Sequence, residues 1–425
     1  MEKDAYIEIV KYAYMNVPYY RNNGFGCDFI ERGEFNTYWG EIPIMNKEIL
    51  RSAGEALVSQ EYMSSLTNNN IIIKRTSGST GKCLNIYWNL KDDVLTNLEA
   101  WRWRKKWYNV SISEKYATFH ATLYGANRFI DDRLYILKNN NNISFNKTLL
   151  NPNNIHEYIC QMKDYNVSVI LTQPSVLKII LDNIGAQDLM ILQQMKYIEL
   201  IGEYLFDSQL QYFKNKLPNV QIANMYGTTE TGYVALTCPY GNMHILNNSY
   251  VEILDDNNEV LESYREGKII LTSRRNKAMP IIRYDIGDKG YTYKVDCPCG
   301  CSGKSIKLTL GRSCDTIILP DGSERPCYIL WYPVEKINAE FEDCILQYHF
   351  YQETDSKIVV FLYVNEKYLG WKEAIEKRLN DSLKECVDCK MLFEILYTTD
   401  DFFTIQNKLN FFSRKDKHCD QEYHI

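Results

Sequence analysis

The sequence has no apolar run long enough to cross a membrane. Its longest apolar stretches, such as Ile358–Val364, have the length of a β-strand, whereas a membrane helix needs about 20 apolar residues. The first ten residues, MEKDAYIEIV, carry early acidic side chains and no apolar segment of signal-peptide length. Together these absences predict a cytoplasmic protein that has no membrane partner.

An excess of positive charge is also missing. Lys and Arg total 48 and Asp and Glu total 54, which gives a net charge of −6, and no polybasic run occurs. Proteins that bind nucleic acid carry a basic surface, so nucleic acid is not an expected partner. The run Trp101–Trp107 mixes aromatic and basic residues. It is more simply an amphipathic helix with outward basic side chains than a stacking platform for bases.

The order of the expected elements divides the chain. Val167–Thr172 is typical of a buried strand, Ser175–Ile184 of a helix and Tyr197–Ile201 of the next strand. Alternation of this kind predicts an α/β sheet with crossover helices. Closely spaced strands follow beyond Tyr250, for example Val251–Leu254.

The last hundred residues have a pattern of their own. Strands are expected at Ile345–Tyr351, Ile358–Val364 and Met391–Tyr397, with an amphipathic helix at Lys372–Glu385. This pattern predicts a small α+β domain, and we place the boundary near Arg312–Asp315. The expected architecture is therefore a large N-terminal α/β domain with a β-rich subdomain (1–312), followed by a small α+β C-terminal domain (313–425).

The loop Thr76-Ser77-Gly78-Ser79-Thr80-Gly81-Lys82 follows the apolar run Ile71–Ile73. A glycine loop after a strand exposes several backbone N–H groups to one anion, and hydroxyls and a lysine add donors and charge. The spacing differs from that of the Walker loop. The loop therefore indicates a phosphate site, and the alternative is a flexible serine–glycine turn.

Three further segments carry polar groups that suit a nucleotide. Asn224–Glu230 offers an aromatic ring for a purine, hydroxyls for phosphate and a carboxylate for Mg²⁺. Arg283–Asp288 offers a carboxylate for ribose hydroxyls, and Leu310-Gly311-Arg312 precedes another strand. The alternative for the first segment is a turn between strands, and a solvated loop is the more common explanation of each of the other two when taken alone. Their order along the chain therefore decides the interpretation.

That order resembles the adenylate-forming superfamily of acyl-CoA synthetases and nonribosomal adenylation domains. Within it, the chain is most similar to the branch of phenylacetate–CoA ligases and CapK-like proteins. That branch opens with a segment like Asn16-Val17-Pro18-Tyr19-Tyr20, and a Leu-Pro-x-x-x-Lys segment follows that is matched by Ile42–Lys47. The resemblance extends from Ala13 to about Arg414, nearly the whole chain.

The resemblance implies ATP and Mg²⁺ as cofactors and assigns roles to residues. The implied ATP-binding residues are Thr76, Ser77, Gly78, Ser79, Thr80, Gly81, Lys82, Gly202, Glu203, Tyr226, Gly227, Thr228, Asp288 and Arg312. Tyr226 would stack on adenine, and Asp288 and Arg312 would hold the ribose. The implied catalytic residues are Lys408, Thr229 and Glu230, of which Glu230 also binds Mg²⁺.

Three residues depart from the family pattern. Asn407 stands where glycine usually precedes the catalytic lysine, Cys314 occupies the usual hinge position beside Asp315, and Cys83 replaces a proline after the phosphate loop. Asparagine tolerates left-handed backbone better than most residues, so the first departure is compatible with Lys408. The second leaves Cys314 and Asp315 as alternative hinges.

The implied reaction joins a carboxylic acid to ATP as acyl-AMP and passes the acyl group to a thiol of CoA or of a phosphopantetheine carrier. An aryl acid is the family-level expectation. Partners would be a small-molecule acid, with a carrier protein and a homodimer left open. One alternative is an adenylyltransferase that passes AMP to a hydroxyl, and another is a nucleotide-binding homologue without turnover.

The cysteines include one dense cluster among thirteen, Cys297-Pro298-Cys299-Gly300-Cys301. Upstream, Cys238 and His244 lie a short loop apart, and phenylacetate–CoA ligases look similar in both segments. Three cysteines and one histidine form a closed tetrahedral zinc set. We therefore expect a structural Zn²⁺ on Cys238, His244, Cys297 and Cys299, with Cys301 as a substitute ligand. The alternative is a reduced, metal-free group of thiols.

Further polar residues align with the family's acyl site. His120 falls where relatives often have an aromatic or histidine gate, although a single histidine on an apolar strand is more often a core residue. Tyr124-Gly125 and Gln173-Pro174-Ser175 would line the carboxylate pocket by analogy.

Overall fold

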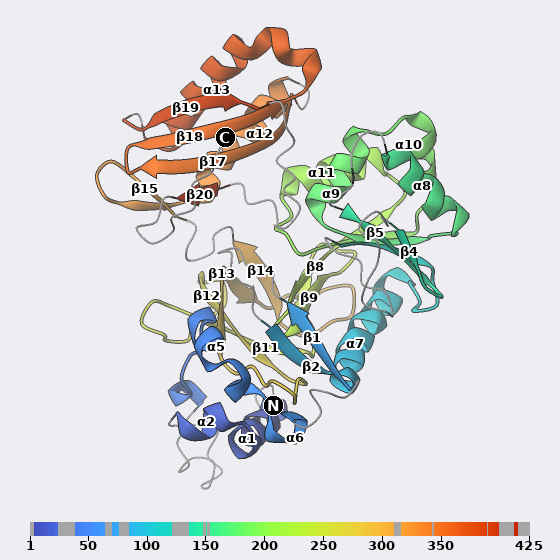
Figure 1. The fold of residues 1–425 in the computed structure, drawn as a ribbon, viewed down its shortest axis with the longest axis vertical. Helices are drawn as coiled ribbons and strands as arrows, with labels where there is room; N and C mark the ends of the chain where they lie inside the picture. The colour runs from blue at the N-terminus through green and yellow to red at the C-terminus, as the bar shows by residue number, and fades with distance from the viewer. Residues whose placement is uncertain are drawn as a thin grey trace. The chain divides into compact units, whose positions relative to one another are not determined.

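The computed structural model describes residues 4–23, 39–63, 70–75, 85–120, 136–147, 150, 154–309, 316–341, 344–388, 390–398 and 412–414. The chain divides into two compact units (Figure 1), one comprising residues 1–286 and 290–309, the other residues 287–289 and 310–425. None of the described helices is both long and apolar enough to cross a bilayer.

The first unit is built on a mixed sheet. In the described chain its twelve strands follow the order β11-β12-β13-β14-β10-β9-β8-β7-β6-β3-β5-β4. The strands are β3 (Tyr116–His120), β4 (Ile136–Lys138), β5 (Asn142–Asn146), β6 (Val169–Thr172), β7 (Tyr197–Ile201), β8 (Gln221–Thr228), β9 (Gly232–Thr237), β10 (Met243–Ile245), β11 (Ser249–Leu254), β12 (Gly267–Ser273), β13 (Tyr284–Tyr293) and β14 (Ser305–Thr309). Neighbours from β8 to β5 run parallel, whereas β8–β9 and β9–β10 are antiparallel. The α/β class with a β-rich part is confirmed.

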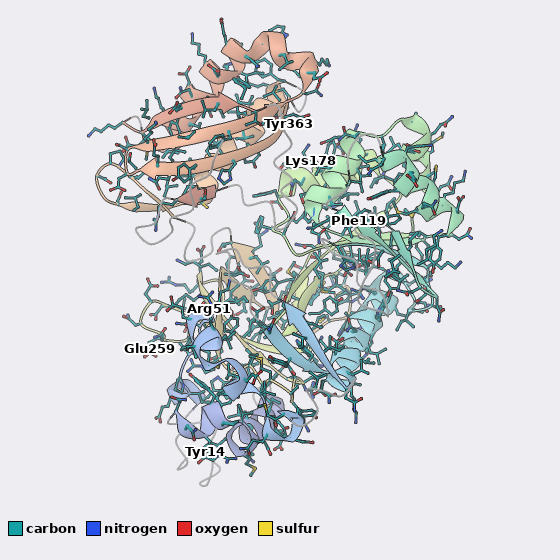
Figure 2. The ribbon with its side chains drawn as sticks, viewed as in Figure 1. Tyr14, Arg51, Phe119, Lys178, Glu259 and Tyr363 are labelled. Atoms are coloured by element: carbon teal, nitrogen blue, oxygen red, sulfur yellow. The ribbon has the colours of Figure 1, made fainter. Side chains whose placement is uncertain are left out.

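Helices cover both faces of the parallel strands. One face packs against α8 (Ile155–Asp164), α9 (Pro174–Asp182), α10 (Ala186–Leu192) and α11 (Asp207–Lys216). Phe119 of β3, labelled in Figure 2, belongs to this core. The other face packs against α7 (Leu90–Tyr108). Strands covered on both faces are mostly apolar, which is why Tyr197–Ile201, apolar apart from Glu199, could be located from its sequence.

The sequence of α7 led to one wrong expectation. Its basic residues were expected to point outward, but the Arg104 side chain is only 1% exposed. Its guanidinium donates to both oxygens of the Glu199 carboxylate on β7, over 2.7 and 2.6 Å, and the Tyr197 hydroxyl donates to the same carboxylate. A buried carboxylate in an apolar strand requires a charged partner, and this requirement directs Arg104 inward.

The N-terminal part of the first unit consists of short helices and one hairpin. Its elements are α1 (Asp4–Asn16), α2 (Pro18–Asn22), η1 (Trp39–Glu41), α5 (Lys47–Ala53), η2 (Gly54–Leu57), α6 (Gln60–Met63), β1 (Ile71–Arg75) and β2 (Asn85–Asn89). A second helix, α2, begins at Pro18, directly after α1. Proline suits a first helical position because its fixed φ matches the helix and it has no N–H to satisfy.

The second unit contains a four-stranded sheet in the order β19-β18-β17-β20. Its elements are β15 (Thr316–Ile318), β16 (Glu324–Pro326), η4 (Cys327–Leu330), α12 (Trp331–Glu340), β17 (Ile345–Thr354), β18 (Lys357–Val364), η5 (Glu366–Trp371), α13 (Lys372–Cys386), β19 (Leu392–Tyr397) and β20 (Phe412–Arg414). Apolar residues of α12 and α13 pack with those of the sheet into a separate core. The strands and the helix expected in this part are all found, within a few residues at their ends.

Candidate functional site

The parallel strands end at a common edge, and the chain turns there at polar residues. His120 is the last residue of β3, Lys147 follows β5, Gln173 follows β6 and Gly202 follows β7. Thr229 follows β8 at the same edge. In open α/β sheets, ligands bind outside the carboxyl ends of the strands. This edge therefore brings the predicted segments 202–203 and 226–230 to neighbouring strands.

Glu203 is fixed by the helix that follows the neighbouring strand. Its carboxylate accepts the backbone N–H of Ser175 over 3.1 Å and the Ser175 hydroxyl over 2.9 Å. Ser175 lies in the first turn of α9, where unpaired N–H groups and the helix dipole favour an anion. Gly202 has a φ of +90° and its Cβ position would lie 3.9 Å from Gln173 Cγ. The loops after β6 and β7 are therefore held together by the hydrogen bonds between Glu203 and Ser175 and by the approach of Gly202 to Gln173.

The turn after β8 is held from both sides. Its Thr228 hydroxyl accepts the Thr231 N–H over 2.9 Å, and the Thr229 carbonyl accepts the indole N–H of Trp88 on β2 over 3.0 Å. Gly232 has a φ of +81°, and a Cβ there would meet Thr96 of α7 at 2.6 Å. Only glycine fits this close approach, so the turn and α7 position each other.

Tyr226 and Glu230, on either side of this turn, are both buried. Tyr226 is 8% exposed and packs with apolar residues of the antiparallel strands. Glu230 is 7% exposed, and its carboxylate accepts the hydroxyl of Tyr284 on β13 over 3.2 Å. Carboxylate oxygens are Mg²⁺ ligands, so Glu230 has the chemistry expected of a magnesium ligand.

The segment that matches the Leu-Pro-x-x-x-Lys pattern lies beside β13. The Met45 N–H donates to the Arg283 carbonyl, and the Asp285 N–H donates to the Met45 carbonyl, over 2.9 and 2.8 Å. The Arg283 guanidinium donates to the carbonyls of Gly40 and Ile42. Arg283 therefore anchors the N-terminal segment, and two motifs that are far apart in the sequence support each other.

The tyrosines of the Asn16–Tyr20 segment contribute to the same support. The hydroxyl of buried Tyr20 donates to the Pro280 carbonyl over 2.7 Å. It also lies 3.0 Å from the Met45 sulfur. This segment thus supports the chain just before β13, the strand that carries Tyr284.

His120 and Lys147 lie near each other at the carboxyl edge. Solvent reaches the His120 side chain, yet the surrounding protein and the Lys147 ammonium lower the pKa of its imidazole. The imidazole is therefore neutral at pH 7. Burial lowers the pKa of Lys147, and the Glu203 carboxylate opposes this shift. Lys147 thus influences His120, and Glu203 influences Lys147.

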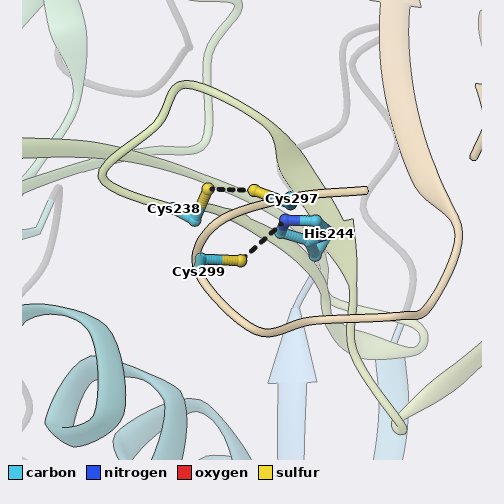
Figure 3. A group of neighbouring side chains, drawn as sticks. All are labelled: Cys238, His244, Cys297 and Cys299. Carbon is cyan, nitrogen blue, oxygen red and sulfur yellow. Dashed lines mark hydrogen bonds between the residues drawn. The ribbon is translucent and has the colours of Figure 1, made fainter. Parts of the chain in front are cut away.

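Cys238, His244, Cys297 and Cys299 form a compact cluster (Figure 3). Cys238 follows β9, His244 lies on β10, and the other two cysteines lie between β13 and β14. The ligand atoms of the four residues all lie within 4.8 Å of one another. Sγ of Cys238 is 3.6 Å from Sγ of Cys297, and Sγ of Cys299 is 3.2 Å from Nε2 of His244. A tetrahedral zinc ion would separate two sulfurs by about 3.8 Å and sulfur from nitrogen by about 3.5 Å. The donor set therefore fits zinc in both chemistry and spacing.

The surroundings of the cluster orient its ligands. The Ser305 hydroxyl lies 3.0 Å from Nδ1 of His244, which leaves Nε2 towards Cys299. Burial, with the Lys106 ammonium, lowers the pKa of His244, so the imidazole is neutral and has a lone pair for a metal. The His244 ring also packs against Trp107, with centroids 5.4 Å apart. A second contact to each ligating histidine is a usual feature of metal sites.

Each half of the cluster is a Cys-Pro-x-Gly turn. In both turns the glycine N–H donates to the cysteine carbonyl, and Gly241 and Gly300 have φ values of +84° and +75°. The third position of the turn is Cys299 in one half and Tyr240 in the other. His244 therefore supplies the fourth donor atom, and Cys301 is outside the group.

Several predicted residues lie outside the described part of the chain. They are Thr76, Ser77, Gly78, Ser79, Thr80, Gly81, Lys82, Cys83, Tyr124, Gly125, Arg312, the alternative hinge residues Cys314 and Asp315, Asn407 and Lys408. Asp288 is described on β13 and is half-buried. Sequence reasoning did not find Lys147 or Trp88. It included Tyr284 in the segment Arg283–Asp288 but did not foresee the contact of its hydroxyl with Glu230. The sequence around Lys147, rich in asparagine, gives little sign that a strand ends there.

Comparison with known proteins identifies the fold. No protein-family profile matches the chain. A 2-hydroxyisobutyryl-CoA ligase solved with R3-HIB-AMP superposes with a TM-score of 0.74 at 12% identity, covering 98% of this chain and 89% of that one. An anthranilate–CoA ligase solved with anthranoyl-AMP gives 0.56 at 15% identity, covering 80% and 66%. The chain has the fold of adenylate-forming enzymes.

One curated relative shares detectable sequence. Bacitracin synthase 3 of Bacillus licheniformis is 28% identical over 156 residues, which cover 36% of this chain and 2% of that protein. The matched segment is thus a very small part of the length of this relative.

Proposed function

We propose that the chain activates a carboxylic acid with MgATP as acyl-AMP and then transfers the acyl group to a thiol. The observation that carries this proposal is the carboxyl edge, where Gly202–Glu203 and Thr228–Glu230 end adjacent strands as their sequence patterns require. Support comes from two solved structures with this fold, which are described as CoA ligases holding acyl-AMP compounds. The similarity to phenylacetate–CoA ligases and an aryl acid as substrate belong to the same proposal.

The first step forms a bond between a carboxylate oxygen and the α-phosphorus of ATP, and pyrophosphate leaves. Negative charge grows on the phosphoryl and leaving groups, and cations that neutralise it lower the barrier. We assign this role to Lys408 and to a Mg²⁺ ion on Glu230. Thr229 would contact the α-phosphate, and Tyr226 would face the adenine.

In the second step a thiol of CoA or of a carrier attacks the acyl carbon, and AMP leaves. We propose residues 1–312 as the core for this chemistry and residues 313–425 as the lid. Asp288 and Arg312 would hold the ribose, and the loop Thr76–Lys82 would bind the phosphates.

The Cys238–His244–Cys297–Cys299 cluster is proposed to hold a structural zinc ion. Four protein ligands complete a tetrahedral shell and leave no position for a substrate or water. The ion would hold together the turns that follow β9 and β13 and would take no part in the reaction.

The test is exchange of pyrophosphate into ATP by the purified chain, with panels of aryl acids, aliphatic acids and amino acids. Exchange that depends on one class of acid would establish acyl-adenylate formation. Label transfer from ATP to a hydroxyl acceptor without exchange would favour an adenylyltransferase. Tight ATP binding without either activity would favour a homologue without turnover.

The role of Lys408 is tested in the same assay. Lys408→Ala is expected to slow exchange at least 100-fold, in line with the loss of one charge-stabilising group in other enzymes, while ATP binding persists. Lys390→Ala, on an exposed loop of the same unit, is the matched control and should retain activity. Full exchange by Lys408→Ala would remove the lysine assignment.

A further inference from the structure

A thiol, an imidazole and a carboxylate form a chain of contacts on two helices of the first unit. Sγ of Cys160 lies 3.5 Å from Nε2 of His156, one turn earlier on α8. Nδ1 of the same imidazole lies 2.9 and 3.0 Å from the two carboxylate oxygens of Asp188 on α10. Residues four apart share one face of a helix, so α8 itself brings the thiol and the imidazole together, and the packing of α10 adds the carboxylate.

The carboxylate determines which nitrogen of the imidazole carries the proton. An ionised carboxylate only accepts hydrogen bonds, so Nδ1–H of His156 donates to Asp188. In a neutral imidazole the other nitrogen, Nε2, then has a free lone pair. The thiol of Cys160 is therefore the donor in its contact with Nε2, and its proton already points at a base.

Burial differs along this chain of contacts. The Asp188 side chain is 9% exposed, whereas that of His156 is 68% exposed. Cys160 is a partly exposed free thiol. A buried carboxylate that holds an imidazole by Nδ1 fixes its tautomer and its orientation. The fixed end of the chain of contacts thus lies inside the protein, and the thiol end is open to a small reagent.

Such an arrangement activates a thiol as a nucleophile. The thiolate is the reactive form of cysteine, and a base within hydrogen-bond reach generates it as the sulfur attacks. Nε2 of His156 is that base, and the Asp188 carboxylate stabilises the imidazolium that forms. A contact that served only to pack α8 against α10 would leave Cys160 with the reactivity of an ordinary surface thiol, so reactivity separates the two roles.

We propose that Cys160 is a modification site, a nucleophilic thiol that exchanges with small disulfides, with His156 as its base and Asp188 as the group that orients the base. The Cys160 sulfur attacks one sulfur of the disulfide, so that a new S–S bond forms as the old one breaks. The thiol proton passes to Nε2 and from there to the departing sulfur. Cys160 is oxidised and the departing sulfur is reduced, and no further reactant is needed. This inference is independent of the proposed activation of an acid.

The experiment treats the purified chain with glutathione disulfide at pH 7 and follows each cysteine by peptide mass spectrometry after a quench with N-ethylmaleimide. Cys160 is expected to form its mixed disulfide at least about tenfold faster than Cys301, because a general base contributes about 100-fold or more. Cys301 is the internal reference, since it is also a partly exposed free thiol. Cys344, which is fully buried, should stay unmodified as long as the chain is folded.

His156→Gln removes the base and should slow modification of Cys160 at least about tenfold, with the rate at Cys301 unchanged. Asp188→Asn should slow it about threefold or more, because an amide can donate to Nδ1 and so move the ring proton to Nε2. Asp207→Asn, which removes an exposed carboxylate from the first turn of α11, is the matched control and should behave as wild type. Modification of Cys160 no faster than that of Cys301, or an unchanged rate in His156→Gln, overturns the inference and leaves the proposed function standing.

Discussion

The cluster of Cys238, His244, Cys297 and Cys299 and the carboxyl edge both gather polar side chains from distant parts of the sequence, but the polar atoms of the two sites differ in how far they are paired. In the cluster, four donor atoms face one another within 4.8 Å, and neighbours such as Ser305 orient the ligands. At the edge, the Glu203 carboxylate accepts both donors of Ser175, whereas Thr172 and Gln173 keep buried atoms without partners in the described chain. A closed set of contacts serves stability, and an open set is available to a ligand.

The largest effect is expected from removal of one of the four residues of the cysteine–histidine cluster. Cys297→Ser takes away a thiolate ligand, and since metal binding free energy is folding free energy, we expect the free energy of unfolding to fall by roughly 3 kcal/mol or more. Zinc analysis and denaturant unfolding measure the two effects. Cys301→Ser is the control, because Cys301 lies outside the group, and it should keep both metal and stability. If Cys297→Ser retained zinc in full, Cys297 would not be a zinc ligand.

A smaller change, an increase in the free energy of unfolding, is expected at the unpaired Thr172 of the carboxyl edge. Thr172→Val replaces an unpaired buried hydroxyl with a methyl of similar shape, which should raise the free energy of unfolding by about 1 kcal/mol and reduce kcat/KM for the acid. Thr118→Val is the matched control, because the Thr118 hydroxyl lies 2.9 Å from Ser144 Oγ. That variant should lose stability. Destabilisation of Thr172→Val by a similar amount would mean that the Thr172 hydroxyl is satisfied in the protein.

The smallest effect concerns pH. Burial and Lys147 lower the pKa of His120 below about 6.5, so the unfolded chain takes up a proton before the folded chain does. His120 then has no effect on stability above pH 6.5 and lowers it as the pH falls below that value. His120→Gln should therefore lose less stability than wild type between pH 7 and pH 5, measured by unfolding at each pH. Identical pH dependence in both proteins would show that the imidazole titrates normally.

Much of the fold could be predicted because its pattern is local. The strand Tyr197–Ile201 was located from its apolar run, and α13 from its helical periodicity. Arg104 was misplaced because periodicity assigns a charged residue to the outer face. Glu199, a glutamate in an otherwise apolar strand, was the sign that a buried cation is needed. Its partner, Arg104, lies 95 residues away in the sequence.

The candidate site was predictable where motif and geometry coincide. The four members of the cysteine–histidine cluster could be predicted from the two Cys-Pro-x-Gly segments and the nearby His244. The position of Lys147 at the carboxyl edge could not be predicted, because it depends on the pairing of β5 with β3. The role of Glu203 at the first turn of α9 was hidden for the same reason, since the parallel order of β6 and β7 is a tertiary property.

The separation of the two cysteine turns also has a consequence in time. Cys238 and Cys297 are 59 residues apart, and a ribosome adds about 5–20 residues each second. Cys238 and His244 thus leave the ribosome roughly 3 to 12 s before the turn that completes their donor set. During that interval the growing chain has only two of the four members of the cluster, Cys238 and His244. The cluster is complete only after Cys297 and Cys299 have been added.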